Sequence, residues 1–224
     1  MPEPVKIDIW SDIACPWCYI GKRNLEAGVA AFAANPEAPD VEVEYHSFEL
    51  SPDTPVDFSG SAIDFLMQHK GLPANRVTQM IDRVVAIAES VGLRYDYDAL
   101  RHTNTVKAHQ LLHYAKAHGK QLEAKERLLR AFFTEGRHVG RAEDLADLAA
   151  EIGLDRDDVL RSLRSDEHLA DVQADVRLAR EYGIQGVPFF VIDGRYGVSG
   201  AQPPETFSSA LDRVLADRSA AVTP

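Results

Sequence analysis

Apolar and polar residues alternate in two short segments near the start of the chain, at residues 5–10 and 41–46. This alternation predicts two strands, the first with one strongly buried face. Between them, apolar residues recur at helical spacing until Asn35 and Pro36 interrupt the pattern. A strand, a helix and a second strand in this order predict a βαβ unit with parallel strands.

The segment between residues 57 and 165 shows helical periodicity without a strand pattern. Its apolar faces and its glycine, proline and asparagine boundaries predict helices near residues 63–70, 73–91, 106–118, 123–135, 143–152 and 157–164. The charged run at residues 123–130 is expected to be a solvated helix face. These residues therefore form one helical block.

The pattern becomes mixed again after residue 165. Residues 166–182 predict an amphipathic helix that Gly183 can end. Two short apolar runs then flank Asp193 and Gly194, a pair that predicts a β-hairpin. Residues 204–216 predict a last helix.

Composition and charge limit the classes of partner. The 224 residues include 35 acidic and 24 basic side chains, for a formal net charge of −11. This excess argues against nucleic acid or an anionic membrane as the main partner. The sequence has no apolar run long enough to cross a bilayer and no signal-peptide pattern, so a cytoplasmic location is expected. The sequence leaves open whether the protein forms a homodimer.

The candidate chemistry lies at the start of the first predicted helix. Cys15 and Cys18, the only two cysteines, flank Pro16 and Trp17 and can close a disulfide within one helical turn. The helix start favours the thiolate of the first cysteine. A structural zinc site would need two more ligands, and a structural disulfide this short would constrain the unfolded chain little. The pair therefore predicts thiol–disulfide exchange, without a metal or a bound cofactor.

Two motifs at opposite ends of the chain resemble those of a known family. Cys15-Pro16-Trp17-Cys18 is similar to the active-site motif of DsbA-type oxidoreductases, in particular the FrnE-like branch. Gly186-Val187-Pro188-Phe189-Phe190 and Gly197-Val198-Ser199-Gly200 resemble the second signature of that branch. The resemblance implies an α/β, thioredoxin-like fold with a large all-helical insertion. Residues 1–56 and 166–224 would form the thioredoxin-like domain, and residues 57–165 the insertion.

The resemblance also implies how the site works. Cys15 would be the nucleophile and Cys18 the resolving thiol, acting on a disulfide- or thiol-containing protein or small molecule. A cis bond before Pro188 would leave the backbone of Val187 free to pair with substrate beside the dithiol. Pro16 and Trp17 would add substrate contacts. Pro16 and Trp17, the two residues between the cysteines, do not indicate whether the protein oxidises or reduces its substrate.

Two rival functions fit the same layout. The kappa-type glutathione transferases and the 2-hydroxychromene-2-carboxylate isomerases are similar in architecture, but they carry a serine at the position of Cys15 and bind glutathione as cosubstrate. The presence of both cysteines favours redox chemistry, while glutathione as a cosubstrate stays open. The other rival function is that of a non-catalytic, chaperone-like binding module.

Weaker signals surround these motifs. Related proteins place a proton-transfer acid six residues before the first cysteine, where this chain has Ile9, so Asp8 and Asp12 are the nearby substitutes.

A pair of histidines has the spacing of a metal site, but the rest of the motif is missing. His109 and His113 lie four apart, with Gln110 where an HExxH motif has glutamate, and no metal site is expected. Asn104, Thr105 and His109 are candidates to line a substrate cleft, with helix capping as the competing role of the first two.

Overall fold

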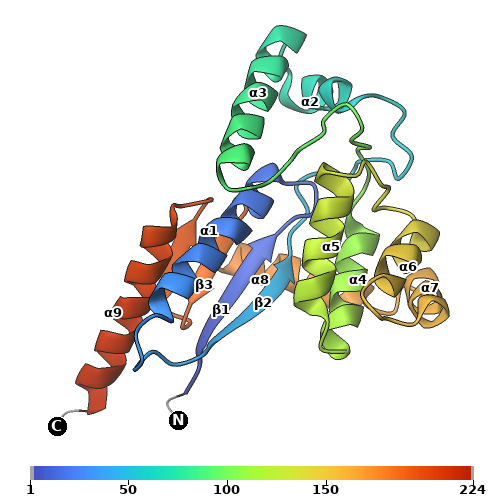
Figure 1. The fold of residues 1–224 in the computed structure, drawn as a ribbon. Helices are drawn as coiled ribbons and strands as arrows, with labels where there is room; N and C mark the ends of the chain where they lie inside the picture. The colour runs from blue at the N-terminus through green and yellow to red at the C-terminus, as the bar shows by residue number, and fades with distance from the viewer. Residues whose placement is uncertain (1–2, 223–224) are drawn as a thin grey trace.

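A four-stranded mixed sheet built from both ends of the chain lies at the centre of the fold (Figure 1). The computed structural model describes residues 3–222. The strands are β1 (Val5–Ser11), β2 (Val41–Ser47), β3 (Phe189–Ile192) and β4 (Tyr196–Ser199), in the order β2-β1-β3-β4. β1 and β2 are parallel, which confirms the βαβ unit. β3 runs antiparallel to β1 and to β4, so the C-terminal hairpin completes a sheet begun by the N-terminus.

One face of the sheet is covered by α1 (Pro16–Phe32) and α9 (Pro204–Val222), which lie side by side (Figure 1). Ile7, Ile9 and Phe190 from the sheet pack there with Phe207. Gly28 permits the close approach of the two helices, because a Cβ atom at this position would lie 2.6 Å from the carbonyl oxygen of Pro204. α9 continues beyond residue 216, where the apolar pattern had predicted its end.

The other face of the sheet is covered by α8 (Leu169–Glu181). Trp10 points to this side, is 1% exposed and donates a hydrogen bond from Nε1 to the carbonyl oxygen of Asp175 over 3.1 Å. The prediction that β1 has one strongly buried face was therefore too narrow, because α8 buries its second face at Trp10. α8 begins at Leu169 rather than at residue 166, since Asp166 takes a positive φ of 55° in the turn before it.

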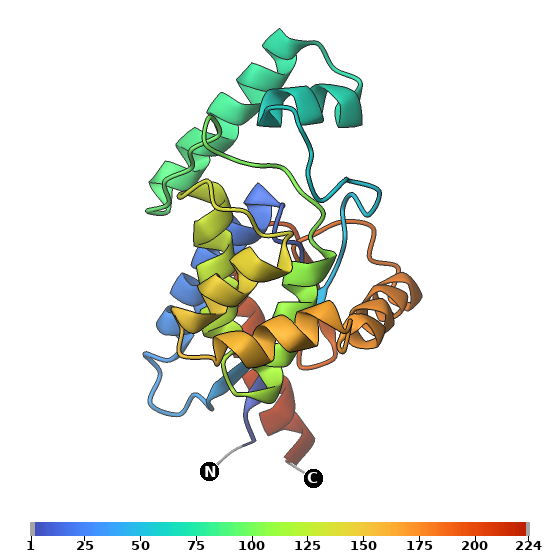
Figure 2. The ribbon, with the colours of Figure 1, turned by 90° about the vertical axis from the view of Figure 1, so that its right-hand side faces the viewer.

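The helices between β2 and α8 have bounds close to those expected from sequence. They are α2 (Ala62–Lys70), α3 (Ala74–Ser90), α4 (Val106–Ala117), α5 (Gln121–Phe133), α6 (Ala142–Ala150) and α7 (Arg156–Arg164). Figure 2 shows α2 and α3 set apart from the bundle of α4 to α7. Ile13, Tyr19 and Ile20 share one apolar cluster with these helices, so the insertion is packed directly onto the start of α1. Within residues 3–222, no helix is long and apolar enough to cross a membrane.

α5 is joined to the edge strand β2 by one side chain. The amide of Gln121 accepts a hydrogen bond from the backbone N–H of Tyr45 and donates one to its carbonyl oxygen, each over 2.9 Å. These two bonds satisfy polar groups of β2 that face away from β1. They also set the position of α5 along the sheet.

A partly buried ion-pair network joins β1, β2 and α8. His46 lies between the carboxylates of Asp175, 2.9 Å from Nδ1, and Asp8, 2.8 Å from Nε2. Burial opposes a charge on the ring, but the hydrogen bonds to these two carboxylates raise the pKa of His46 to about 9. His46 is therefore a cation at neutral pH. Its folded-state pKa lies above the ordinary value of 6.5, so its contribution to stability is complete below pH 6.5 and is lost as the pH rises through about 9.

This network predicts a pH-dependent effect of His46→Gln. Between about pH 6 and about pH 10, the parent protein is expected to lose about 3 kcal/mol more unfolding free energy than the variant, because only the parent has this histidine to deprotonate. Urea unfolding at the two pH values measures the difference. His118→Gln, at an exposed histidine beyond the end of α4, is the control. Parallel pH curves for the parent and His46→Gln would contradict the assignment.

Candidate functional site

The two cysteines lie at the start of α1, as the sequence predicts. Cys15 is the N-cap residue, Pro16 follows in the first turn, and the backbone N–H of Cys18 donates to the carbonyl oxygen of Cys15 over 3.0 Å. Both are free thiols, 3% and 2% exposed. The helix start therefore places the two cysteines one turn apart along the chain, and both side chains are almost fully buried.

The ionisation of each thiol depends on the other. Burial opposes ionisation of Cys18, but the hydrogen bond from Cys15 and the charge of Lys125 lower the pKa of Cys18. The same hydrogen bond, together with burial, raises the pKa of Cys15 well above its usual value. A charge on either thiol opposes ionisation of the other, so the pair favours a single negative charge. The thiolate on Cys15 stays a prediction of the helix-start argument.

The hairpin at the far end of the chain reaches Cys15. Cys15 Sγ donates to the carbonyl oxygen of Val187 over 3.5 Å, and the Val187–Pro188 peptide bond is cis. Gly21 on α1 allows this approach, since a Cβ atom there would lie 3.0 Å from the ring of Pro188. The two sequence motifs, more than half the chain apart, thus form one site.

A cavity of about 650 Å³ opens beside Cys15. Cys15, Pro16, Trp17 and Val187 line its inner side, while Cys18 and Pro188 do not contribute to its wall. The opposite wall comes from the helical insertion and is mainly apolar, with Phe65, Ile81, Val84, Leu100 and Phe132. Trp17 is 40% exposed at this surface. A molecule in the cavity would therefore meet the sulfur of Cys15 before that of Cys18.

Asp12 lies in the loop after β1 and is fully buried. Thr105 Oγ1 and the backbone N–H of Leu50 each donate to its carboxylate over 2.8 Å, and His109 Nε2 lies 3.3 Å away. Burial opposes the charge, but the hydrogen bond and charge of His109 and these donors lower the pKa of Asp12. Asp12 is therefore held as a carboxylate and does not carry a proton for transfer at neutral pH.

The other residues singled out near the cleft have different positions. Thr105 lines the cavity with Asp12, whereas His109 is fully buried behind them. Asn104 caps α4, because its Oδ1 accepts from the backbone N–H of Val106 over 2.9 Å. Asp8 belongs to the His46 network, on the face of β1 opposite Ile9. The capping role thus holds for Asn104, and of the two aspartates only Asp12 lies beside the dithiol.

The histidine pair of α4 does not converge on a common point. His109 contacts Asp12, while His113 Nε2 lies 3.0 Å from Asp175 and 3.1 Å from Ser47.

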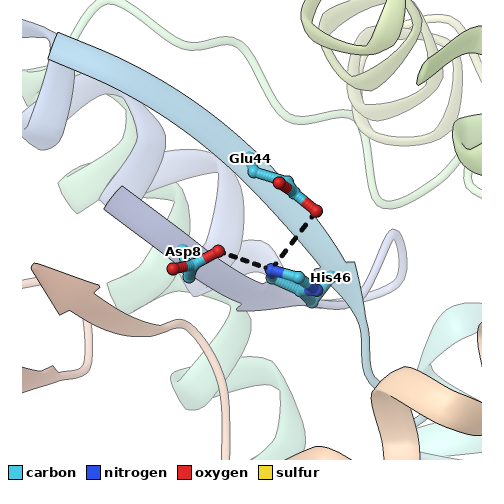
Figure 3. Close-up of side chains that lie close together, drawn as sticks. All are labelled: Asp8, Glu44 and His46. Atoms are coloured by element: carbon cyan, nitrogen blue, oxygen red, sulfur yellow. Dashed lines mark hydrogen bonds and ion pairs between the residues drawn. The ribbon is translucent and has the colours of Figure 1, made fainter. Parts of the chain in front are cut away.

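Asp8, Glu44 and His46 do have the separation of metal ligands (Figure 3). Lys6 Nζ, however, lies 2.9 Å from both carboxylates, and Lys116 also pairs with Glu44. Because His46 is itself protonated, this cluster is an ion-pair network whose positive charges come from the protein.

Lys125 is the site residue that the sequence pattern misses. It belongs to the charged run expected to be a solvated helix face, yet its side chain is 0% exposed. That prediction was wrong at this position because α5 packs against both β2 and the start of α1. Lys125 stands four residues after Gln121, on the same face of the helix, and this spacing was the available signal.

A solved structure is closely similar to this chain. A protein described as a probable DsbA oxidoreductase from Streptomyces coelicolor is 38% identical, with a TM-score of 0.86 over 95% of this chain and 90% of that one.

More distant structures share the fold. The cytosolic disulfide reductase DsbM from Pseudomonas aeruginosa, solved with GSH, is 19% identical, with a TM-score of 0.65 over 94% of this chain and 99% of that one. A 2-hydroxychromene-2-carboxylate isomerase is 15% identical, with a TM-score of 0.67 over 97% of this chain and 100% of that one. At these identities the likeness concerns the fold alone.

The family model for DsbA-like thioredoxin domains matches residues 6–212, from the first residues of β1 into α9. The match includes both cysteines, the helical insertion and the hairpin that carries Val187 and Pro188. The fold is the expected thioredoxin-like sheet interrupted by helices. This chain belongs to the DsbA-like thioredoxin domain family.

Proposed function

We propose that this protein is a thiol–disulfide oxidoreductase that works through Cys15 and Cys18. The observation that carries the proposal is the unequal access of the two thiols. Cys15 lines the cavity and contacts the carbonyl oxygen of Val187, whereas Cys18 lies behind it. An attacking thiol must reach substrate, and a resolving thiol must reach only the attacking one.

The geometry supports a two-step exchange. In the first step the thiolate of Cys15 attacks one sulfur of a substrate disulfide. The substrate S–S bond breaks, one substrate thiolate leaves, and a mixed disulfide forms. Cys18 then passes its proton to the substrate thiolate that left first and attacks the sulfur of Cys15, which releases the second substrate thiolate. The protein ends oxidised and the substrate ends reduced by two electrons; the reverse order oxidises a dithiol.

Substrate is proposed to lie across the hairpin and the start of α1. Val187 and Pro188 would present backbone groups to an extended segment, and Pro16 and Trp17 would pack against its side chains. The insertion would act as the wall that selects among substrates. We place the protein in the FrnE-like branch on the motif around Cys15, and in the cytoplasm by analogy with the cytosolic disulfide reductase DsbM, which shares its fold.

The cysteine assignment predicts different behaviour of two serine variants. Cys15→Ser should abolish exchange with a disulfide substrate, whereas Cys18→Ser should accumulate a mixed disulfide on Cys15 because the resolving thiol is missing. Mass spectrometry of the intact protein after acid quenching measures the adduct. Equal exchange rates in both variants and the parent would exclude this function. Retained binding without exchange in the double variant would favour the chaperone-like alternative.

Glutathione is the second candidate in this site, as cosubstrate of the same exchange. The observation that favours it is a group of basic side chains, His69, Lys70 and Arg83, on an otherwise mainly apolar cavity wall. Lys70 and Arg83 would meet the carboxylates of a small acidic thiol such as glutathione. The cavity volume lies in the range of small-molecule sites.

This second candidate predicts a charge effect. In the Cys18→Ser background, Lys70→Ala with Arg83→Ala should slow formation of the glutathione adduct about fivefold, as expected for the loss of two partly exposed ion pairs. Arg76→Ala, on the exposed first part of α3, is the matched control. Stopped reactions analysed by mass give the rates. Unchanged rates would exclude glutathione binding by Lys70 and Arg83. Isomerase activity in a variant that lacks both cysteines would support the glutathione-dependent isomerases as the class of this protein.

A further inference from the structure

A row of rings forms part of the cavity wall that belongs to the helical insertion. Phe65 of α2 stacks on His69, with 5.4 Å between ring centroids and 12° between ring planes, and its centroid lies 3.4 Å from that of His102. His102 in turn lies 6.0 Å from the ring of Phe132 in α5. All four rings line the cavity. Because aromatic rings pack favourably on one another beyond the area they bury, this wall suits a planar aromatic ligand.

His102 is the member of this row whose polar atoms the protein leaves unused. Its Nδ1 is buried and has no hydrogen-bond partner among residues 3–222. The residue is nevertheless only partly buried and lines the cavity, so Nε2 is the ring nitrogen that a bound molecule can reach. A neutral imidazole carries one proton, and we place it on Nε2 because Nδ1 has no acceptor beside it. His102 then offers a hydrogen-bond donor to the cavity.

The charge state of the wall narrows the ligand further. Burial lowers the pKa of His102 to about 4, against a smaller opposing effect of Asp12. His102 is therefore neutral at physiological pH and suits an uncharged acceptor. The basic side chains of Lys70 and Arg83 on the same cavity disfavour a cationic ligand.

The row lies across the cavity from the reacting sulfur. Cys15 and Val187 line the inner side, and the cavity of about 650 Å³ between them and the insertion has the volume of a small-molecule site. A substrate whose sulfur meets Cys15 can therefore place the rest of the molecule against the rings. Neither the thiols nor the hairpin need His102 for the exchange itself.

We propose that this cavity binds a small aromatic thiol or disulfide, whose ring packs on the row formed by Phe65, His102 and Phe132 and whose uncharged acceptor group takes a hydrogen bond from His102 Nε2. The inference rests on the proposed thiol–disulfide exchange and deepens it by naming a substrate class. His102 is a specificity-determining residue in this arrangement, and its proton stays on the imidazole throughout.

The reaction balances without another reactant. One aromatic disulfide and the reduced protein give two aromatic thiols and the Cys15–Cys18 disulfide. The substrate S–S bond breaks, the protein S–S bond forms, and the two protons of the protein thiols end on the two aromatic thiols. The substrate gains the two electrons that the protein loses.

The test compares three disulfides in the Cys18→Ser background. Dipyridyl disulfide, with each ring nitrogen opposite the sulfur, has a ring and an acceptor; diphenyl disulfide has only the ring; bis(hydroxyethyl) disulfide has no ring. His102→Phe should slow adduct formation on Cys15 with dipyridyl disulfide about fivefold, as expected for the loss of one neutral hydrogen bond. The rates with the other two disulfides should stay within about twofold, since neither offers a ring acceptor to His102.

Two further variants separate recognition from a structural effect. His102→Gln keeps an N–H donor near the position of Nε2 and should recover most of the rate with dipyridyl disulfide. His118→Phe, the same replacement at an exposed histidine beyond α4, should leave all three rates unchanged. An equal loss with all three disulfides in His102→Phe, or an unchanged rate with dipyridyl disulfide, would overturn the role of His102.

A binding measurement makes the test independent of exchange. Dipyridyl sulfide is a thioether that cannot react with a thiol, and calorimetry should show it binding to the parent at least about tenfold more tightly than bis(hydroxyethyl) sulfide, because its rings bury more apolar surface. Equal affinities would overturn the aromatic class. If the parent exchanges with no disulfide, the proposed function fails, while binding of the thioether still tests the cavity and His102 on their own.

Discussion

The antiparallel pairing of β1 with β3 is the contact on which the candidate site depends. It aligns Trp10 with Phe189, so the preceding residues Val187 and Pro188 are brought to the end of β1 and meet Cys15. Without this pairing the two motifs would belong to separate ends of a chain interrupted by a long insertion. The site is therefore a property of the completed sheet, and the hairpin contributes to it through backbone atoms.

A second constraint is the shortage of water around the thiols. Cys15 and Cys18 are both almost fully buried, so the charge that exchange requires has to be stabilised by the protein. Cys15 lines the cavity, whereas Cys18 does not. This unequal access explains how a buried dithiol can still meet a substrate through one of its two sulfurs.

The helical insertion contributes more than a wall to the cavity. α5 supplies Lys125 to the interior of the thioredoxin-like half, and Gln121 ties the same helix to β2. α4 supplies Thr105 and His109, which hold Asp12 as a carboxylate beside the start of α1. On the other side of the sheet, His46 and Asp175 join β2 to α8. The insertion and the sheet consequently share their buried charges, and the insertion is part of the site's electrostatics.

The sequence by itself determined the elements and the reacting atoms. Alternation identified β1 and β2, helical periodicity identified the insertion, Asp193 and Gly194 identified the hairpin, and the spacing of Cys15 and Cys18 identified the dithiol. These features are local, since each depends on residues within a few turns or one strand. Only the tertiary structure decided that Lys125 is buried and that β1 has a second buried face at Trp10. Each of these depends on which distant element packs against the residue, and the local pattern of a helix or strand does not carry that information.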